Sequence, residues 1–205
     1  VELSMCRNIT VSHNSIYDTP RAGINISEGT WGGHIIEYND IFNTVKETGD
    51  HGTINSWGRD RFWHPNYNIM TQITNEKPAL ILADVVEPII IRHNRLRCDR
   101  GWDIDLDDGS SNYQIYNNLC LNGGIKLREG FYRTVENNII VNNTLHPHLW
   151  FKNSGDVFSR NIVMTKYKPI SVRGWGREVD YNIFADSLAY LAARQLGGDA
   201  HSIVT

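Results

Sequence analysis

A short element, Asn-x-Ile or Asn-x-Leu, recurs along this chain and limits the possible folds more than any other feature. Clear copies begin at Asn14, Asn39, Asn94, Asn117 and Asn137. The aliphatic anchors, including two degenerate copies, are Ile16, Ile41, Leu96, Leu119, Ile139, Ile162 and Ile183. The intervals between successive anchors are 25, 55, 23, 20, 23 and 21 residues. Repeats of this length are typical of solenoids, in which each repeat packs only on its neighbours.

The asparagine in each repeat indicates which kind of solenoid this is. Asparagine is usually depleted in strands, yet here it stands next to apolar residues. In parallel strands stacked about 4.8 Å apart, equivalent asparagines at turns can form hydrogen-bonded ladders, and asparagine tolerates left-handed backbone. We therefore expect an all-β fold, a right-handed parallel β-helix. A propeller needs longer repeats, a leucine-rich repeat needs more regular leucines, and an antiparallel sandwich does not explain the asparagine spacing.

Each repeat also contains a second alternating segment after the aliphatic anchor. These second strands are expected at Gly23–Ser27, Gly52–Trp57, Trp102–Asp107, Gly124–Arg128, His148–Lys152 and Pro169–Arg173. The long interval is explained by an insertion at 58–87, which we expect to form one wall of a cleft. A short helix is expected over Ser187–Gly197. We interpret 1–205 as one β-helix domain with truncated ends, a fragment that packs against the rest of the same polypeptide, because neither end resembles a capping repeat.

Charged residues gather on two adjacent second strands. Alternate strand residues face opposite sides, so Ile104, Leu106, Ile125 and Leu127 are expected to point inward. The residues expected to point outward are Asp103, Asp105 and Asp107 in one strand, and Lys126 and Arg128 in the next. A row of carboxylates then lies beside a row of cations, and the sequence predicts the functional site there.

Stacking all second strands extends these rows into two outward columns. The first column is Asn25, Asn55, Asp105, Lys126, Trp150 and Ser171, and the second is Ser27, Trp57, Asp107, Arg128, Lys152 and Arg173. Aromatic rings beside charged groups suit a sugar-binding cleft, because rings stack on pyranose C–H faces while charged groups bind hydroxyls. The ordinary alternative is a solvated charged face.

The two aspartates Asp105 and Asp107 are candidates for acid/base catalysis. They are two residues apart in one strand, so about 6.6 Å separates them, at the boundary between the carboxyl spacings of retaining and inverting glycosidases. Repulsion between them should raise one pKa. Arg128 beside Asp107 should keep that group ionised, which makes Asp105 the expected proton donor. Asp60, in the insertion, is the alternative partner.

Further residues around these aspartates are expected to bind substrate. They are His51, Trp57, Arg59, Lys126, Arg128, Glu129, Trp150 and Lys152. Asp108 and Glu129, at the strand ends, are candidates either for chemistry or for binding within the ladder. His146 and His148 lack further ligands at zinc-binding spacing, so no metal site is predicted.

Three segments carry a resemblance to a known family. Glu47–Trp63, Asp103–Tyr113 and Gly197–Val204 together resemble secreted bacterial β-helix glycoside hydrolases, most closely glycoside hydrolase family 141, with its fucosidase and xylanase members. The resemblance implies a secreted or periplasmic enzyme that needs no cofactor and cleaves a plant-type or similar polysaccharide. It also implies paired catalytic aspartates, carried here by Asp50, Asp60, Asp105 and Asp107.

Two alternatives belong to other functional classes. In a calcium-dependent polysaccharide lyase, Asp105 and Asp107 would hold Ca²⁺ against a uronate, and Lys126 or Arg128 would abstract its C5 proton. In a non-catalytic carbohydrate-binding solenoid, the same groups would only bind. The net charge of −3 gives no reason to expect nucleic acid or an anionic membrane as a partner. The three cysteines indicate neither a disulfide framework nor a zinc site.

Overall fold

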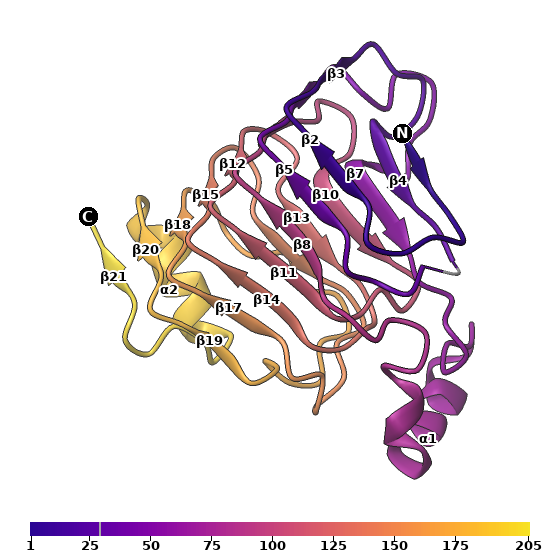
Figure 1. Cartoon of the computed structure of the whole chain (residues 1–205). Helices are drawn as coiled ribbons and strands as arrows, with labels where there is room; N and C mark the ends of the chain where they lie inside the picture. Colours follow the sequence, from indigo (N-terminus) through magenta and orange to yellow (C-terminus); the bar gives the residue numbers. More distant parts are fainter. Residues whose placement is uncertain (29) are drawn as a thin grey trace.

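The computed structural model describes residues 1–28 and 30–205, and it consists mainly of short parallel strands (Figure 1). Sheet A contains, in spatial order, β1 (Glu2–Leu3), β4 (Ile24–Ile26), β7 (Gly52–Trp57), β10 (Trp102–Asp107), β13 (Ile125–Leu127) and β16 (Leu145–Pro147). Sheet B contains β2 (Thr10–Ser12), β5 (Ile35–Glu37), β8 (Ile89–Arg92), β11 (Tyr113–Tyr116), β14 (Arg133–Glu136), β17 (Val157–Ser159) and β19 (Glu178–Asp180). Sheet C contains β3 (Ser15–Tyr17), β6 (Asp40–Phe42), β9 (Arg95–Arg97), β12 (Leu119–Cys120), β15 (Ile139–Ile140), β18 (Ile162–Val163), β20 (Ile183–Phe184) and β21 (Ile203–Val204). The expectation of an all-β chain in parallel sheets is confirmed.

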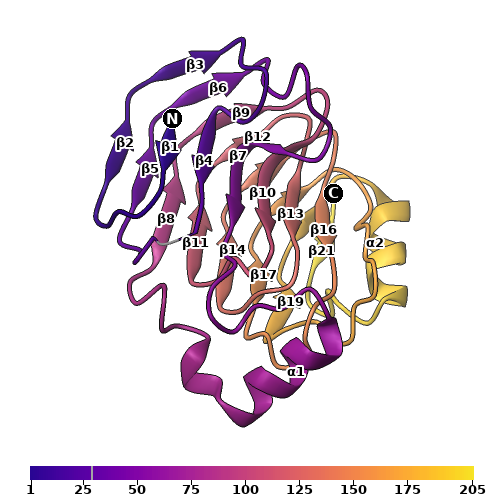
Figure 2. The ribbon, with the colours of Figure 1, turned by 90° about the vertical axis from the view of Figure 1, so that its right-hand side faces the viewer.

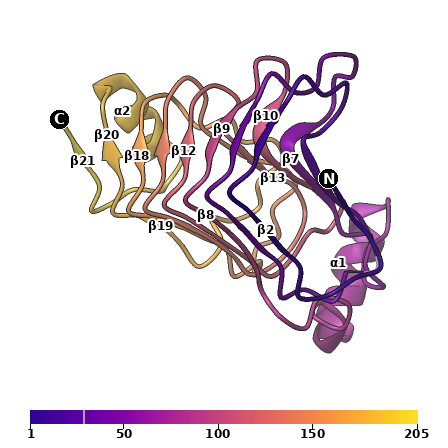
Figure 3. The same ribbon diagram turned by 45° about the horizontal axis from the view of Figure 1, so that its top comes forward.

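The chain visits the three sheets in turn. From β2 to β18, consecutive strands pass from sheet B to sheet C to sheet A, and each interior strand of a sheet pairs in parallel with the strand one turn earlier and one turn later. Figure 3 shows these successive turns side by side from the N-terminal to the C-terminal end. Every interior strand therefore has its backbone groups satisfied by its two neighbours.

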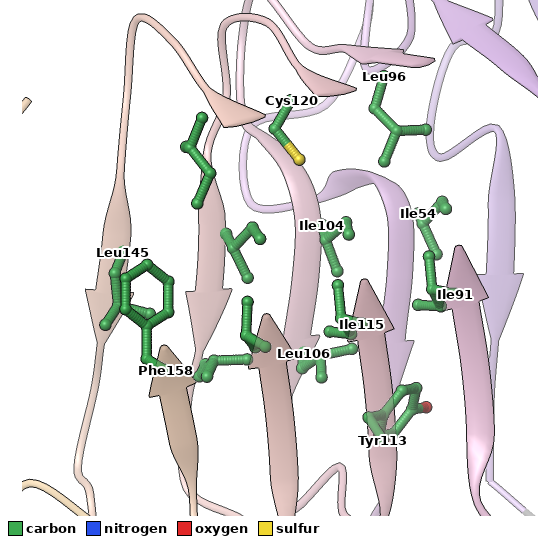
Figure 4. Packing of buried hydrophobic residues seen from close by; sticks show 14 of the residues in the cluster. Ile54, Ile91, Leu96, Ile104, Leu106, Tyr113, Ile115, Cys120, Leu145 and Phe158 are labelled. Carbon is green, nitrogen blue, oxygen red and sulfur yellow. The ribbon is translucent and has the colours of Figure 1, made fainter. Parts of the chain in front are cut away.

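The main apolar core lies between the three sheets. Figure 4 shows Ile104 and Leu106 of β10 pointing toward Leu96 of β9 and Ile115 of β11. These four side chains are fully buried. Alternation along β10 therefore leaves its aspartates on the opposite, outer side of sheet A.

An asparagine ladder runs along the turns that precede sheet C. Its members are Asn14, Asn39, Asn94, Asn118, Asn138, Asn161 and Asn182. The backbone N–H and the side-chain Nδ2 of each member donate to Oδ1 of the next, at 2.9–3.3 Å. The ladder ties each turn of the chain to the next through buried amides, which confirms the expected role of the repeated asparagine.

The register differs by one residue from the prediction in the C-terminal half. Ile41 and Leu96 are partners as expected, but Leu96 pairs with Cys120 rather than with Leu119. The true inward residues are Cys120, Ile140, Val163 and Phe184, whereas Ile139 and Ile162 are exposed. In the pairs Asn117-Asn118 and Asn137-Asn138 the second asparagine joins the ladder, while the first has a positive φ. Because strand periodicity is two, this one-residue shift reverses the faces.

The insertion between β7 and β8 folds over one end of sheet A. It contains α1 (Tyr67–Glu76), capped by the Asn66 side chain, and a 3-10 turn at Pro78–Leu80. A second apolar cluster anchors it and consists of Phe62, Met70, Ile81, Phe131 and Phe151. Figure 2 shows α1 beside the ends of the sheet A strands. The expected helix near the C-terminus forms as α2 (Ser187–Gln195), with Ala189 and Ala193 in the main core.

Two of the expected second strands are wrong. The sixth strand of sheet A is Leu145–Pro147 rather than His148–Lys152, because Leu145 and Pro147 pair with Ile125 and Leu127. Pro169–Arg173 forms no strand, only a bridge between Ile170 and His148. Among the described residues, none of the helices is long and apolar enough to span a bilayer.

Candidate functional site

Two columns of polar side chains stand on the outer face of sheet A. Asn55, Asp105 and Lys126 occupy one register position, and Trp57 and Asp107 occupy another. Arg128 directly follows the paired residue Leu127, so it continues the second column. These placements agree with the predicted columns as far as β13. Beyond it, the shorter sixth strand puts His146 next to Lys126, where Trp150 was expected.

Lys126 lies at the centre of three carboxylates. Its Nζ is 3.1 Å from Asp105 Oδ1, 3.4 Å from Asp107 Oδ2 and 3.5 Å from Asp50 Oδ1. The ammonium also lies 4.1 Å from the centre of the Trp102 ring, a cation–π contact. A side chain at Gly52 would place its Cβ 2.8 Å from Asp105 Cβ, so glycine permits the close approach of β7 to this cluster.

Burial and charge determine the protonation of this cluster. Burial raises the pKa of Asp105 to about 7, although Lys126 opposes the rise. Burial by itself would lower the pKa of Lys126, but Asp105, Asp107 and Asp50 outweigh it and raise that pKa. Asp105 has no exposed surface, so it lies beneath the surface rather than on it. This corrects the expectation that Asp105 meets substrate directly as the proton donor.

Arg128 organises a second set of acids at the ends of the strands. Its guanidinium lies 3.1 Å from Asp107, 2.9 Å from Asp108 and 2.9 Å from Glu129. Two residues of the insertion bind the same acids, because Arg59 pairs with Asp108 at 2.9 Å and the Trp63 indole donates to Glu129 at 3.0 Å. The insertion is therefore attached to the strand ends by polar contacts as well as by its apolar cluster.

An open groove of about 330 Å³ lies above these side chains. It is lined by Arg21, Asp50, His51, Asn55, Trp57, Arg59, Asp107, Asp108 and Arg128. The predicted residues His51, Trp57, Arg59, Asp107 and Arg128 thus share one concave surface. Lys126 lies below its floor, since only 4% of that side chain is exposed.

His51 and Trp57 are both held by Arg21. The Arg21 Nε donates to His51 Nε2 at 2.9 Å, so the ring proton belongs on Nδ1, which lies 3.1 Å from Thr48 Oγ1. Burial and Arg21 lower the pKa of His51, which favours the neutral ring. The Arg21 guanidinium also lies 4.9 Å from the centre of the Trp57 ring, and the indole N–H donates to Glu28.

Besides the buried Asp105 and Lys126, three predicted site residues, Asp60, Trp150 and Lys152, lie away from the groove. Asp60 lines a separate small hollow with Ser56, Ser110 and Tyr113, and burial raises its pKa to about 7. Trp150 is fully buried in the main core, where its indole donates to the Leu127 carbonyl at 2.9 Å. The prediction that the Trp150 ring binds sugar is therefore wrong.

The third of these residues, Lys152, lies in a different pocket. It is exposed and lines a hollow beside α1 together with Tyr67, Phe151 and Arg173. Glu129 is also too buried to meet a ligand directly, since only 2% of the residue is exposed. It serves instead as the acceptor that joins Arg128 to Trp63.

The structure adds residues that the sequence reasoning did not assign. His148 follows Pro147, the partner of Leu127, so it stands next to Arg128. Burial, Lys126 and Arg128 lower its pKa while Asp107 and Asp50 oppose them, so it lies within the field of the cluster. The sequence signal that could have identified His148 is its two-residue spacing from His146, since residues two apart in a strand lie on the same face.

Asp103, expected among the outward acids, is completely buried. Its carboxylate accepts backbone N–H groups from Cys98 at 2.7 Å, Asn122 at 3.1 Å, Gly123 at 2.9 Å and Gly124 at 3.1 Å. These four amides belong to two successive turns of the chain. Asp103 therefore holds the turns that lead into β10 and β13 and takes no part in the groove.

The cluster does not fit a divalent cation. Carboxylate oxygens of Asp50, Asp105 and Asp107 lie within 4.8 Å of one another, close enough to share an ion. However, the Lys126 ammonium already lies within 3.5 Å of all three carboxylates. A metal ion there would meet a buried positive charge, so this site disagrees with the calcium site of the lyase alternative.

Comparison with known proteins does not assign the chain to a family. No protein-family model, curated protein or solved structure matches the chain. The fold and the site together define an all-β protein of stacked parallel sheets, with a charged groove on the outer face of sheet A.

Proposed function

We propose that the chain is a right-handed parallel β-helix whose groove binds and hydrolyses a complex glycan. The repeated passage from sheet B to sheet C to sheet A supports the helical winding. The handedness follows from the strong preference for right-handed crossovers between parallel strands. The resemblance of Glu47–Trp63 and Asp103–Tyr113 to glycoside hydrolase family 141 supports the same function, and a polysaccharide substrate favours action outside the cytoplasm.

The observation that carries this proposal is the arrangement of Asp50 and Asp107. Both line the groove, both pair with Lys126, and their nearest carboxylate oxygens lie within 4.8 Å. Retaining glycosidases place their two carboxyl groups about 5–5.5 Å apart, closer than inverting enzymes do. The separation therefore favours a retaining reaction by two carboxylates without a metal.

The contacts of the two carboxylates suggest different roles. Asp107 is held by Lys126 and Arg128, so its negative charge is stabilised and its position is fixed, as a nucleophile requires. Asp50 is the more exposed group, with 77% of its side chain accessible, and it would exchange protons with the leaving group and with water. Asp105 would act as a positioning residue, because it reaches the groove only through Lys126.

Other groove residues would bind sugar hydroxyls and rings. Arg59 presents polar N–H groups to the groove, and the partly exposed Trp57 adds an apolar surface beside them. Hydrogen bonds of charged groups are roughly twice as strong as neutral ones. This combination is suited to a polar glycan.

The lyase alternative is disfavoured by the electrostatics of its candidate bases. Burial tends to lower the pKa of both Lys126 and Arg128, but neighbouring carboxylates outweigh it and raise both. A base that removes a C5 proton must be unprotonated, so both residues are poorly suited to that step.

One observation favours a non-catalytic glycan-binding protein as the second candidate. Among residues 1–28 and 30–205, each carboxylate that lines the groove already has a cationic partner: Asp50 and Asp107 pair with Lys126, and Asp108 pairs with Arg59 and Arg128. Such neutralised acids can bind hydroxyls without turnover.

A panel of plant and mucosal glycans tests these possibilities, with reducing ends and ultraviolet absorbance measured together. Hydrolysis is expected to release reducing ends without absorbing unsaturated products. Asp107→Asn and Asp50→Asn should each lower the rate about 10²–10⁴-fold, while Asp40→Asn, a partly exposed acid on sheet C, should not. Unsaturated products would indicate a lyase, and binding without any product would indicate the non-catalytic alternative.

A further inference from the structure

A second hollow, separate from the groove, lies between α1 and the segment that follows β16. It has a volume of about 490 Å³ and is lined by Tyr67, Thr71, Asn75, Phe151, Lys152, Asn153 and Arg173. Two of the seven lining residues are cations, and none is an acid. In this respect it differs from the groove, where Asp50, Asp107 and Asp108 contribute carboxylates.

The guanidinium of Arg173 is held in a defined place in this hollow. Its central carbon lies 4.3 Å from the centre of the Tyr67 ring. Tyr67 is itself fixed, because its ring stacks on Phe151 at 4.8 Å and its hydroxyl donates to the Trp150 carbonyl at 3.1 Å. The guanidinium carries planar N–H groups whose arrangement matches a carboxylate.

The positive charge of the hollow is not neutralised internally. In the described ranges 1–28 and 30–205, no carboxylate lies within ion-pair distance of Arg173 or Lys152. By contrast, Arg59 and Arg128 at the groove are both paired with acids. The concave shape, the ordered guanidinium and the unpaired charge are complementary to an anionic ligand.

The hollow is connected to the groove through the insertion. Arg128 lines the groove and pairs with Glu129, and Glu129 accepts from Trp63. Trp63 and Tyr67 both pack against the apolar cluster that contains Phe151. Both concave sites thus flank the insertion, at the same end of the sheet A strands.

We propose that this hollow is a subsite for a carboxylate-bearing sugar, a uronate unit, with Arg173 as the main carboxylate ligand and Lys152 as a second cation. The proposal rests on glycan binding by this protein and narrows the substrate class to acidic glycans. It assigns to Lys152 a ligand-binding role at a place away from the carboxylate pair.

The test is titration calorimetry of the full chain with a trimer of galacturonate and with the matching neutral trimer of galactose. Arg173→Gln and Lys152→Gln should each weaken binding of the acidic trimer about tenfold, the value of one lost charged hydrogen bond. Arg177→Gln, an exposed cation beyond the hollow, is the matched control and should have no effect. Thermal melting of each variant checks that the fold is intact.

Repeating the titration in the Asp107→Asn background separates this inference from the proposed hydrolysis. Acidic-trimer binding that survives Asp107→Asn but falls with Arg173→Gln supports the subsite, whether or not turnover is seen. Equal affinity for the neutral trimer, no binding of either trimer, or an unchanged affinity in Arg173→Gln would overturn it, even where hydrolysis of other glycans is observed.

Discussion

The Lys126 ammonium lies 3.1 Å from Asp105 Oδ1, and 4% of the Lys126 side chain and none of the Asp105 side chain is exposed. The pair is buried, yet it lies on the outer face of sheet A, covered by neighbouring polar groups rather than by the apolar core. Such a pair contributes little net stability when intact, but leaves a costly charge when one partner is removed.

Replacing Lys126 should therefore destabilise the protein strongly. Lys126→Met is expected to lower the free energy of unfolding by about 3–5 kcal/mol above neutral pH, because Asp105 then lacks its counter-charge. The double variant with Asp105→Asn should recover much of this loss. Urea unfolding measures both, with the exposed Lys166→Met as control. Additive effects of the two substitutions would contradict a coupled pair.

The pH dependence of stability should report on Asp105. Burial raises its pKa to about 7 from the ordinary value of 3.8, so the folded chain keeps a proton that the unfolded chain has lost. This group's contribution to stability is therefore lost progressively between pH 4 and pH 7, and the loss is complete above 7. Between about pH 5 and about pH 8, unfolding free energy should fall less in Asp105→Asn than in wild type. Equal pH profiles of wild type, Asp105→Asn and the partly exposed control Asp40→Asn would argue against this assignment.

Asn117 and Asn118 offer a test of the ladder and its register. Asn118 is buried and its amide bonds to Asn94, Asn138 and two backbone carbonyls, so Asn118→Ala should cost about 2–4 kcal/mol through unpaired buried groups. Asn117 is exposed with φ 56°, and Asn117→Ala should cost about 1 kcal/mol for left-handed backbone. Chemical unfolding compares the two. A larger loss of stability in Asn117→Ala than in Asn118→Ala would contradict the assignment of Asn118 to the ladder.

The two tryptophans Trp150 and Trp57 should separate stability from binding. Trp150 is fully buried, so Trp150→Phe, which keeps an aromatic ring but loses the indole donor, should still destabilise by about 1–3 kcal/mol. Trp57 lines the groove, so Trp57→Ala should weaken glycan binding with a much smaller effect on melting temperature. Calorimetric melting and glycan titration of both variants check this. Unchanged glycan affinity in Trp57→Ala would count against the groove as the binding site.

Much of the site was predictable because β10 and β13 carry the same alternation of apolar and charged residues. Once Ile104 and Ile125 are aligned, Asp105 must lie beside Lys126, since strand alternation and parallel pairing leave no other arrangement. The alignment failed after β13, where Leu145 and Pro147 pair with Ile125 and Leu127 in place of the expected strand His148–Lys152. The burial of Asp105 also escaped prediction, because alternation states the face of a residue and not what covers it.

The amino-acid pattern by itself determined the stacking of parallel strands, the asparagine ladder and the neighbours of Asp105 and Asp107. Those features depend on contacts between equivalent positions one turn apart, so the repeat contains them. Only the tertiary structure decided that Lys126 closes over Asp105, that Asp60 leaves the groove and that Asp50 joins it. These outcomes depend on turns and on an insertion without internal periodicity, whose positions follow from packing and charge pairing across distant parts of the chain.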